Sequence, residues 1–375
     1  MQTDKTIRIT IIGGGIVGAT VAANLALKGL NVSLIEQETI GGNGATKFSG
    51  ALFRVHDPDP EIARLTRRSV ELMQESQVGK IFKKTLKQTG IIYAAELNQK
   101  NIELVKTSIR DYCDSLYPLE LISAEKAFEL TNGCYSKHNN RIILFEPNGG
   151  FGYIRHTVSN LAQVVRDTGN LVLENTKVHA ITTENGKAIV QLAHSTIEAD
   201  YIVLAIGAWT KTLAYKLPVN AKSIPLANIR TSYSTNMPII DTETGTHIVP
   251  LAEYFYQAGS KIRNVAETPE DIEYNDNIIE NDISERLLKS KFKHEPSNIL
   301  SIIKGYDSYT PDERPILDFI DEEKRCFVAA GFCGIGYKIA LAVSEIITLN
   351  LLPTELSTDF LKQKNQIFSY SRFTY

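Results

Sequence analysis

The first 35 residues show a strand, helix and strand pattern of apolar and polar positions. Ile7 to Ile12 alternates and then becomes continuously apolar, as expected of a strand that enters a buried parallel sheet. Ile16 to Lys28 has helical composition and ends at Gly29, a residue suited to a helix C-terminal cap. A second apolar run, Asn31 to Ile35, follows. The pattern predicts a β-α-β unit at the start of the chain.

The turn between the first strand and the helix reads GGGIVG, residues 13–18. Gly13 permits a tight turn, Gly15 lets the backbone approach a pyrophosphate, and Gly18 lets helix and strand pack closely. Glu36 ends the second strand, where an acidic side chain accepts hydrogen bonds from ribose hydroxyls. These residues predict a dinucleotide site with its phosphates at the helix N-terminus. The alternative is a glycine turn that only packs the β-α-β unit.

Later segments predict a second layer of structure. Short β-like patterns separated by Pro, Gly or Asn occur in Leu226 to Ser234, His247 to Tyr256 and Ser260 to Val265, which favours an antiparallel sheet. Asp271 to Lys293 is polar and helix-prone, so we expect it outside the sheet. A chain of 375 residues exceeds the ~250 to 300 at which single cores stop growing. Two domains are therefore expected.

Charge and cysteine usage exclude several function classes. The 40 Lys and Arg balance 43 Asp and Glu, so the net charge of −3 provides no strong field for nucleic acid or an anionic membrane. The four cysteines, at positions 113, 134, 326 and 333, have neither CxxC nor metal-ligand spacing, so no disulfide framework and no metal site are expected. Met1 to Arg8 lacks secretory-signal features, and no apolar run approaches ~20 residues. We expect a cytoplasmic protein without a transmembrane segment.

A glycine-rich segment after Glu36, Gly41 to Gly50, suits a backbone that follows an extended ligand, and resembles the flavin-contacting segment of the D-amino acid oxidase superfamily. That superfamily includes glycine oxidase, sarcosine oxidase and D-amino acid dehydrogenase. Pro60 to Met73 is similar to the helix that follows in the family. Further blocks that resemble the family are Phe145 to Ile181, Asp200 to Thr210, Thr310 to Leu317 and Ala330 to Glu345.

The resemblance implies an α/β (α+β) fold, with a Rossmann-like FAD-binding domain of the glutathione-reductase-2 type and a second, mostly antiparallel β-sheet substrate domain. The FAD-binding domain is expected from residues 1–88, 150–217 and 315–375, and the substrate domain from 89–149 and 218–314. The implied activity is oxidation of a C–N bond of an amino acid or amine by hydride transfer to FAD. The expected partners are a small amine or amino acid and an electron acceptor, either oxygen or another compound.

The cofactor-binding residues that the fingerprint and the resemblance predict are Gly13, Gly15, Ile16, Val17, Gly18, Glu36, Gln37, Ala45, Thr46, Val178, Ala205, Gly207, Trp209, Gly334, Ile335, Gly336, Tyr337 and Lys338. Glycines and a helix N-terminus near Tyr337 suit a flat ligand and negative charge on a reduced flavin. Lys338 adds a full charge there. Gly305 stands where sarcosine oxidases carry the cysteine attached to flavin, so FAD is expected to be noncovalent.

Three charged residues are candidates for the reacting site. Arg54 resembles a carboxylate-binding arginine of sarcosine oxidases; the alternatives are an ion pair with Asp57 or Asp59, or a contact with a flavin phosphate. Lys261 resembles the oxygen-activating lysine of sarcosine oxidase, or is the solvated tip of a hairpin. Asp307 occupies a place where glycine oxidase-like sequences commonly carry a carboxylate-binding arginine, or caps a turn.

Two departures from the family keep other functions open. Ile335 replaces a histidine, and the acid at 307 repels an α-carboxylate, which favours an amine or a substrate with a second cationic group. Oxidation of a 2-hydroxy acid and a flavoprotein subunit with lost turnover remain alternatives. His247, Tyr254, Tyr256 and Tyr309 are further candidates for the pocket wall, although such alternating aromatics are often one packed face of a strand.

Overall fold

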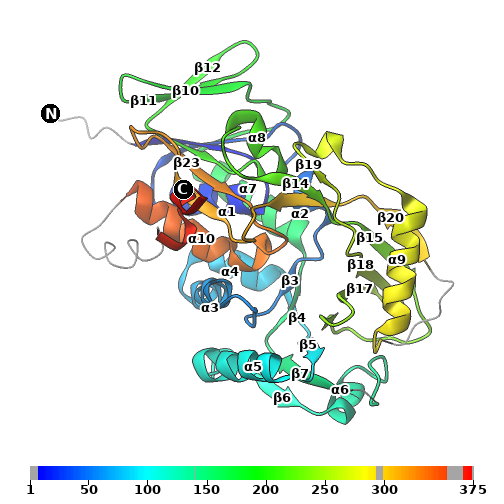
Figure 1. The fold of residues 1–375 in the computed structure, drawn as a ribbon. Coiled ribbons are helices and arrows are strands. Elements are labelled where there is room, and N and C mark those ends of the chain that lie inside the picture. The colour runs from blue at the N-terminus through cyan, green and yellow to red at the C-terminus, as the bar shows by residue number, and fades with distance from the viewer. Residues whose placement is uncertain (1–6, 139, 293–298, 353–365, 374–375) are drawn as a thin grey trace.

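The computed structural model describes residues 7–138, 140–292, 299–352 and 366–373 (Figure 1). Residues 1–6, 353–365 and 374–375 of the expected FAD-binding segments lie outside this description, as does Lys293 at the end of the expected helical segment. The fold is mixed α/β, and the described residues form five sheets. Among the described residues, no helix combines the length and apolarity needed to cross a bilayer.

A six-stranded sheet gathers segments from distant parts of the chain. Its strands, in spatial order, are β22 (Ile316–Phe319), β23 (Cys326–Ala330), β13 (Tyr201–Leu204), β1 (Arg8–Ile12), β2 (Asn31–Ile35) and β9 (Leu171–Leu173). All neighbouring pairs are parallel except β22 with β23. The expected first strand and second strand are confirmed as β1 and β2. Their carboxyl ends meet at one edge, where open parallel sheets bind ligands.

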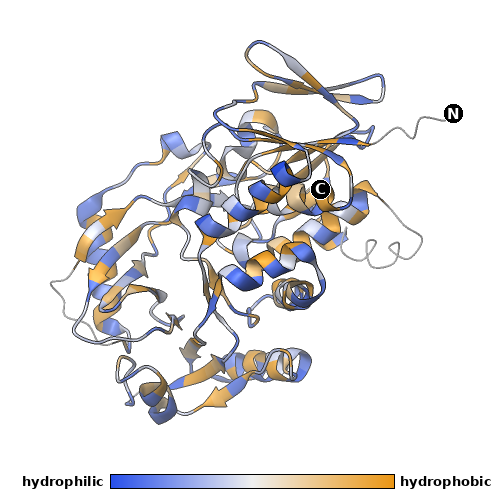
Figure 2. Ribbon diagram, turned by 180° about the vertical axis from the view of Figure 1, so that it is seen from behind, coloured by the Kyte–Doolittle hydropathy of each residue, from blue (hydrophilic) through white to orange (hydrophobic). Residues whose placement is uncertain are grey.

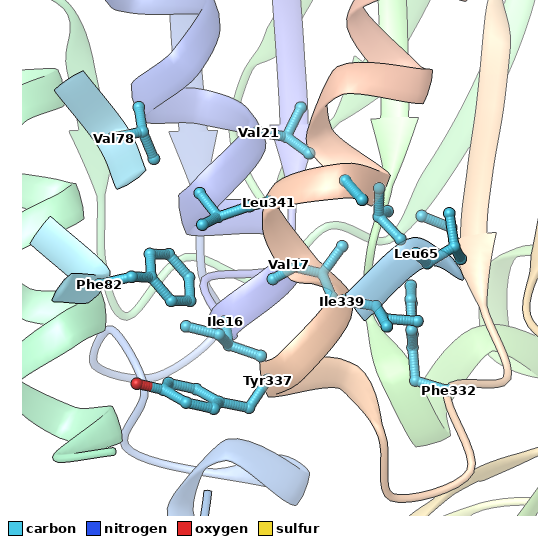
Figure 3. Close-up of a cluster of buried hydrophobic side chains, with 14 of the residues drawn as sticks. Ile16, Val17, Val21, Leu65, Val78, Phe82, Phe332, Tyr337, Ile339 and Leu341 are labelled. Atoms are coloured by element: carbon cyan, nitrogen blue, oxygen red, sulfur yellow. The ribbon is translucent and has the colours of Figure 1, made fainter. Parts of the chain in front are cut away.

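Helices pack beside this sheet and on one another. They are α1 (Ile16–Leu27), α3 (Pro60–Glu75), α4 (Gln77–Thr85), α7 (Ile154–Asp167) and α10 (Gly336–Leu351). Helix α1 is buried on nearly every side, as its almost continuous apolar sequence requires. Figure 3 shows side chains from α1, α3, α4 and α10 converging in one cluster, with Val17, Phe82 and Leu341 among them. The segment 336–351 is thereby locked against the amino-terminal helix.

An eight-stranded sheet forms the second layer. Its spatial order is β20 (Ile299–Ile303), β15 (Leu226–Arg230), β18 (Phe255–Gly259), β17 (Thr246–Ala252), β16 (Ile239–Asp241), β5 (Ile91–Glu96), β7 (Arg141–Glu146) and β6 (Glu120–Ile122). Neighbouring pairs are antiparallel apart from β16 with β5. Helix α9 (Asp276–Lys289) lies along β15, β18 and β17, whereas α5 (Gln99–Tyr112) and α6 (Ala124–Leu130) lie beside β7 (Figure 1).

One expected strand is wrong. Ser260 to Asn264 is irregular, and only Val265–Ala266 forms a short strand, β19. The Ser260 hydroxyl and the Lys261 backbone N–H both donate to Asp282 of α9, at 2.6 and 3.0 Å. These contacts replace the ladder hydrogen bonds that would extend the sheet. The hydrophobic pattern could not show this, because the partner lies on a distant helix.

Three small sheets complete the fold. They are β10 (Ala180–Glu184), β11 (Lys187–Gln191) and β12 (Thr196–Ala199); β3 (Leu52–Phe53), β8 (Gly150–Gly152) and β4 (Leu86–Gln88); and β19 with β14 (Asn220–Ser223) and β21 (Tyr306–Tyr309). The first set projects from one end of the molecule as a twisted hairpin with a third strand (Figure 1). Surface helices show hydrophilic and hydrophobic stretches side by side (Figure 2), consistent with one buried face each.

Candidate active site

A pocket of about 550 Å³ is lined by residues from both large sheets. One part is formed by the β1-α1 turn, the end of β2 and the segment 43–52. Another part is formed by β15, β16 and β17, together with residues 305–309 of β21 and its preceding turn. The pocket therefore connects the predicted nucleotide site with the second layer, where a substrate would meet a flavin.

The glycines of the β1-α1 turn have the geometry that the fingerprint predicts. Gly13 has φ +108°, and a Cβ there would collide with the Ala205 carbonyl. A Cβ on Gly18 would collide with the Gly13 carbonyl oxygen, so this glycine serves close packing. At Gly15 the nearest atom to an added Cβ is Thr46 Oγ1, 3.2 Å away, and the residue faces the pocket. The turn leaves a backbone cradle that a side chain at 15 would fill.

Glu36 both closes this turn and faces the pocket. Its Oε2 accepts a hydrogen bond from Gly14 N–H at 2.6 Å, and its Oε1 accepts one from Glu38 N–H at 3.0 Å. Burial raises the pKa of the carboxyl, against the lowering effect of these N–H donors. A carboxylate has further acceptor capacity, so two ribose hydroxyls can still be bound. No acidic residue occupies the first turn of α1, which leaves the helix dipole free to favour phosphate.

Segment 43–52 carries the pocket wall from the nucleotide part toward the second layer. Thr46 Oγ1 accepts from Ile16 N–H at 3.0 Å, which fixes the start of the short helix α2 (Gly44–Phe48) against α1. Farther along, a Cβ on Gly50 would lie 2.8 Å from Val249 of β17. The glycine-rich segment thus passes within contact distance of the eight-stranded sheet, which suits a planar ligand held between the layers.

The carboxy-terminal glycine loop is held by Asp307. Gly334 has φ +84° and donates its N–H to Asp307 Oδ2 at 2.7 Å, while Ser308 N–H donates to Oδ1 at 2.7 Å. Burial raises the pKa of Asp307 to about 6, despite these donors. Asp307 lies within β21 and so does not cap a turn before Tyr309; its carboxyl instead holds the glycine loop and also lines the pocket. Its contact with a substrate stays a prediction.

Most predicted cofactor residues line this pocket. They are Gly13, Gly15, Ile16, Val17, Glu36, Gln37, Ala45, Thr46, Val178, Ala205, Gly207, Trp209, Gly334, Gly336 and Tyr337. Gly18, Ile335 and Lys338 are absent from the lining. For Lys338 this corrects the expectation of a charge beside the flavin, because its side chain is only 4% exposed and its Nζ binds Asp57 Oδ2 at 2.7 Å.

Arg54 lies in the pocket wall beside this buried ion pair. Its Nη2 is 3.6 Å from Asp57 Oδ2, so the pairing with Asp57 is present, whereas Asp59 instead binds Arg314. The guanidinium lies over the Tyr93 ring at 5.2 Å, and its buried Nη1 has no hydrogen-bond partner in the described part of the chain. Burial alone raises the pKa of Asp57, but the charges of Lys338 and Arg54 lower it to about 2. Arg54 therefore retains an unused donor.

Glu146 fixes the backbone that follows Arg54, a role that the sequence did not reveal. Its carboxylate accepts from Val55 N–H at 2.6 Å, His56 N–H at 3.1 Å and the Tyr117 hydroxyl at 2.7 Å. The side chain is fully buried, and this burial raises its pKa. The acidic-glycine turn at 146–150 thus ties the Arg54 segment to β7.

Lys261 is not brought to the pocket. It is exposed, and its side chain lies against Gly245 on the neighbouring turn. The cation that does line the pocket in this region is Arg263, whose Nη1 donates to the carbonyls of Ser260 and Ile262 at 2.8 Å. Arg263 was not among the predicted residues, and its position two residues after Lys261 is the signal that the sequence offered for it.

Of the four aromatic or imidazole candidates, two line the pocket and two do not. His247 and Tyr309 line the pocket, and burial together with the charge of Arg263 lowers the pKa of His247 to about 4. Tyr256 is fully buried behind the sheet, where its hydroxyl accepts from Thr235 N–H at 2.7 Å. Tyr254 is exposed at a tight turn with φ +64°. Strand alternation alone could not decide which face meets the pocket.

Three known proteins are similar along nearly the whole chain. N-methyl-L-tryptophan oxidase of Yersinia pestis (strain Pestoides F) is 23% identical, and the similarity covers 91% of this chain and 94% of the relative. The crystal structure of L-proline dehydrogenase from P. horikoshii matches with TM-score 0.82 and 23% identity, covering 98% of both chains. Glycine oxidase from Geobacillus kaustophilus matches with TM-score 0.79 and 19% identity, covering 99% of this chain and 100% of that chain.

These likenesses agree with the site geometry. The β1-α1 glycine turn, Glu36 and residues 332–334 and 336 of the carboxy-terminal glycine loop line one pocket, an arrangement that suits the dinucleotide cofactor FAD. The family pattern of FAD-dependent oxidoreductases matches residues 8–349, which include both large sheets. The chain belongs to this family, the FAD-dependent oxidoreductases of the D-amino acid oxidase type.

Proposed function

We propose that the protein oxidises a C–N bond of an amino acid or amine at this pocket. Bound FAD would supply the acceptor for a hydride from the carbon that bears nitrogen, and hydrolysis of the imine product would release ammonia or an amine. The main support for this substrate class is the buried Nη1 of Arg54, which has no hydrogen-bond partner among the described residues. A guanidinium of this kind suits a carboxylate, and relatives named as oxidases or dehydrogenases of amino acids support the same class.

The residues around Arg54 prepare it to bind an anion. Asp57 accepts from Lys338 and lies near Nη2 of Arg54, while Glu146 holds the next two backbone N–H groups. The guanidinium is thereby fixed before substrate arrives, which lowers the entropic cost of binding. Oxidation of a 2-hydroxy acid would use the same carboxylate contact. Release of ammonia or an amine distinguishes oxidation of a C–N bond from oxidation of a hydroxy acid.

The experiment is an anaerobic screen of flavin bleaching with amino acids, N-methylated amino acids, amines and 2-hydroxy acids. We expect bleaching by a nitrogen-bearing compound, with release of ammonia or an amine after turnover. Bleaching by hydroxy acids alone would establish the second candidate. A yellow protein that no compound reduces would support a flavoprotein subunit with lost turnover.

We further propose that FAD is held without a covalent bond. Gly305, at the predicted attachment position, has no thiol, and Cys333 of the pocket wall donates its thiol to Gly331 O at 3.2 Å. Burial raises the pKa of Cys333 to about 12, so the nucleophilic thiolate is rare at neutral pH. Acid precipitation should release the whole yellow colour into the supernatant. Colour that stays with the precipitate would contradict this proposal.

The domain division, the compartment and the electron acceptor also remain proposals. Each strand of the eight-stranded sheet lies within 89–149 or 218–314, which supports the expected substrate domain. A cytoplasmic location is supported by the free state of all four cysteines. Cell fractionation tests the location, and comparison of oxygen with a quinone as oxidant of the reduced protein tests the acceptor.

A further inference from the structure

One row of residues crosses the pocket-facing side of the eight-stranded sheet. His247 of β17 is paired with Ile240 of β16, and Ile240 is paired with Tyr93 of β5. Paired residues on neighbouring strands point to the same side of a sheet. His247 and Ile240 line the pocket, and the Tyr93 ring supports the Arg54 guanidinium. The row therefore runs from Arg54 to His247.

The spacing of strands sets the length of this row. Neighbouring strands lie ~4.8 Å apart, so Tyr93 and His247, with one strand between them, are separated by about 10 Å. This separation of the two backbones exceeds the length of a molecule as small as glycine. The surface between them is apolar, since Ile240 lies on the row and Val249 lines the pocket beside it.

His247 is the polar group at the end of the row. Its ring lies directly over Gly259 of β18, where a Cβ would collide with the imidazole, and it has no hydrogen-bond partner within the described ranges. Burial and Arg263 lower its pKa to about 4, so the imidazole is neutral at neutral pH. A neutral imidazole has one donor and one acceptor nitrogen. Such a weak base is a poor proton acceptor from an ammonium group but a good hydrogen-bond partner.

We propose that His247 determines specificity by hydrogen-bonding a polar group at the far end of a substrate whose carboxylate is held by Arg54. The substrate class is an amino acid with an extended, largely apolar side chain or N-substituent that ends in a hydroxyl or amide. This inference rests on the proposed function for the Arg54 contact. What it adds is the hydrogen bond between His247 and the far end of the substrate.

The test uses two acids that lack an amine and therefore cannot be oxidised. The FAD-loaded protein is titrated with phenylacetate and with 4-hydroxyphenylacetate, and binding is followed by the change in the flavin spectrum. We expect the hydroxylated acid to bind about 3- to 10-fold more tightly, the usual effect of one neutral hydrogen bond. His247→Phe should reduce this preference to about one, whereas His247→Gln should restore part of it.

Two further variants separate the hydrogen bond from general packing. Gly259→Ala displaces the imidazole without removing it, so the preference should fall. Val249→Ala enlarges the apolar wall and should change the affinities of both acids by a similar factor, leaving their ratio intact. FAD content, measured from the flavin absorbance, shows that each variant has folded.

Three results would overturn the inference: no preference in the wild-type protein, an undiminished preference in His247→Phe, or failure of both acids to bind. These results differ from a failure of the proposed function. A protein that prefers the hydroxylated acid but is bleached by no amine would retain the His247 contact and lose the amine-oxidising activity. Bleaching by amines without a preference for the hydroxylated acid would retain the amine-oxidising activity and contradict the His247 contact.

Discussion

Lys338 Nζ lies 2.7 Å from Asp57 Oδ2, with only 4% and 12% of the two side chains exposed. The pair joins the start of α10 to the loop that carries Arg54. Burial lowers the pKa of Lys338 to about 8, and Asp57 partly offsets this effect. Lys338 therefore supports Arg54 through the carboxylate of Asp57, which contacts both side chains.

Asp57→Asn should destabilise the protein by ~3 to 5 kcal/mol, because it leaves Lys338 buried without its counter-charge. Urea unfolding of the FAD-loaded protein, followed by circular dichroism, measures this loss. The double variant Asp57→Asn with Lys338→Met removes both charges and should recover part of the stability. Equal stability of Asp57→Asn and the wild type would show that the pair is dispensable.

Gly15→Val should deplete FAD, because its side chain would occupy the cradle next to Thr46 where the pyrophosphate is expected. The ratio of flavin absorbance to protein absorbance in the purified variant gives the occupancy. Gly29→Ala is the matched control, since Gly29 has φ +80° but no atom within 4 Å of its added Cβ. It should cost ~1 kcal/mol of stability and retain FAD. Full occupancy in Gly15→Val would place the phosphates elsewhere.

Asp307 should make stability fall as the pH rises. Its folded pKa of about 6 exceeds the ordinary value of 3.8, so the folded state binds the extra proton between these values. This contribution is complete below pH 3.8, is lost as the pH rises through 6, and amounts to at most ~3 kcal/mol. His56 and His247 have lowered pKa values and act in the opposite sense.

For that reason the test compares the wild type with Asp307→Asn rather than following one protein. The difference in unfolding free energy between the two proteins should change between pH 4 and pH 7. The wild type should lose stability relative to Asp307→Asn as the pH approaches 7. A difference that stays constant across this range would mean that the Asp307 pKa is ordinary.

Asp307→Asn should also alter selectivity for substrate charge. A buried acid in the pocket disfavours small neutral-side-chain amino acids unless it is neutralised, and it favours a cationic group. Loss of a desolvated charge pair costs ~2 to 5 kcal/mol, so a cationic substrate should bind many-fold more weakly to the variant, with little effect on neutral ones. Anaerobic flavin reduction gives both affinities. Efficient oxidation of glycine or alanine, unchanged in the variant, would show that Asp307 does not face the substrate.

Arg263→Met should slow reoxidation of the reduced protein by oxygen, whereas Lys261→Met should leave it nearly unchanged. Of these two residues, Arg263 lines the pocket and Lys261 does not, and a nearby cation favours the negative charge that forms on oxygen. Stopped-flow mixing of reduced protein with oxygen measures the rate, and anaerobic reduction by substrate is the control. The opposite ranking would restore the oxygen role that the sequence predicts for Lys261.

Local chemistry made the amino-terminal elements predictable. The second strand was expected at Asn31 to Ile35 and occurs there, and α1 begins at Ile16 as expected, because the glycine turn fixes the start of the helix and Gly29, with φ +80°, ends it. The contacts that prepare Arg54 were not predictable in the same way. Asp57 and Lys338 are far apart in sequence, and Glu146 meets Val55 through its side chain, so only tertiary packing brings them together.

The pocket face of the second sheet was only partly predictable. An alternating pattern identifies two faces of a strand but not which one meets a ligand, so His247 could not be ranked above Tyr256 from the sequence. The register of β17 with β16 decides this. Lys261 shows the same limit, because Asp282 on α9 turns the backbone after β18 away from the ladder.

The place of β23 and α10 has a consequence for the order of synthesis. β23 pairs with β13 inside the six-stranded sheet, and α10 packs on α1. Both elements nevertheless lie between residues 326 and 351, so they are synthesised about 300 residues after β1 and α1. A ribosome-bound chain that ends before Cys326 already holds the first glycine turn but lacks the loop at 331–336. Capture of the flavin therefore waits until this later segment has been made and β23 has paired with β13.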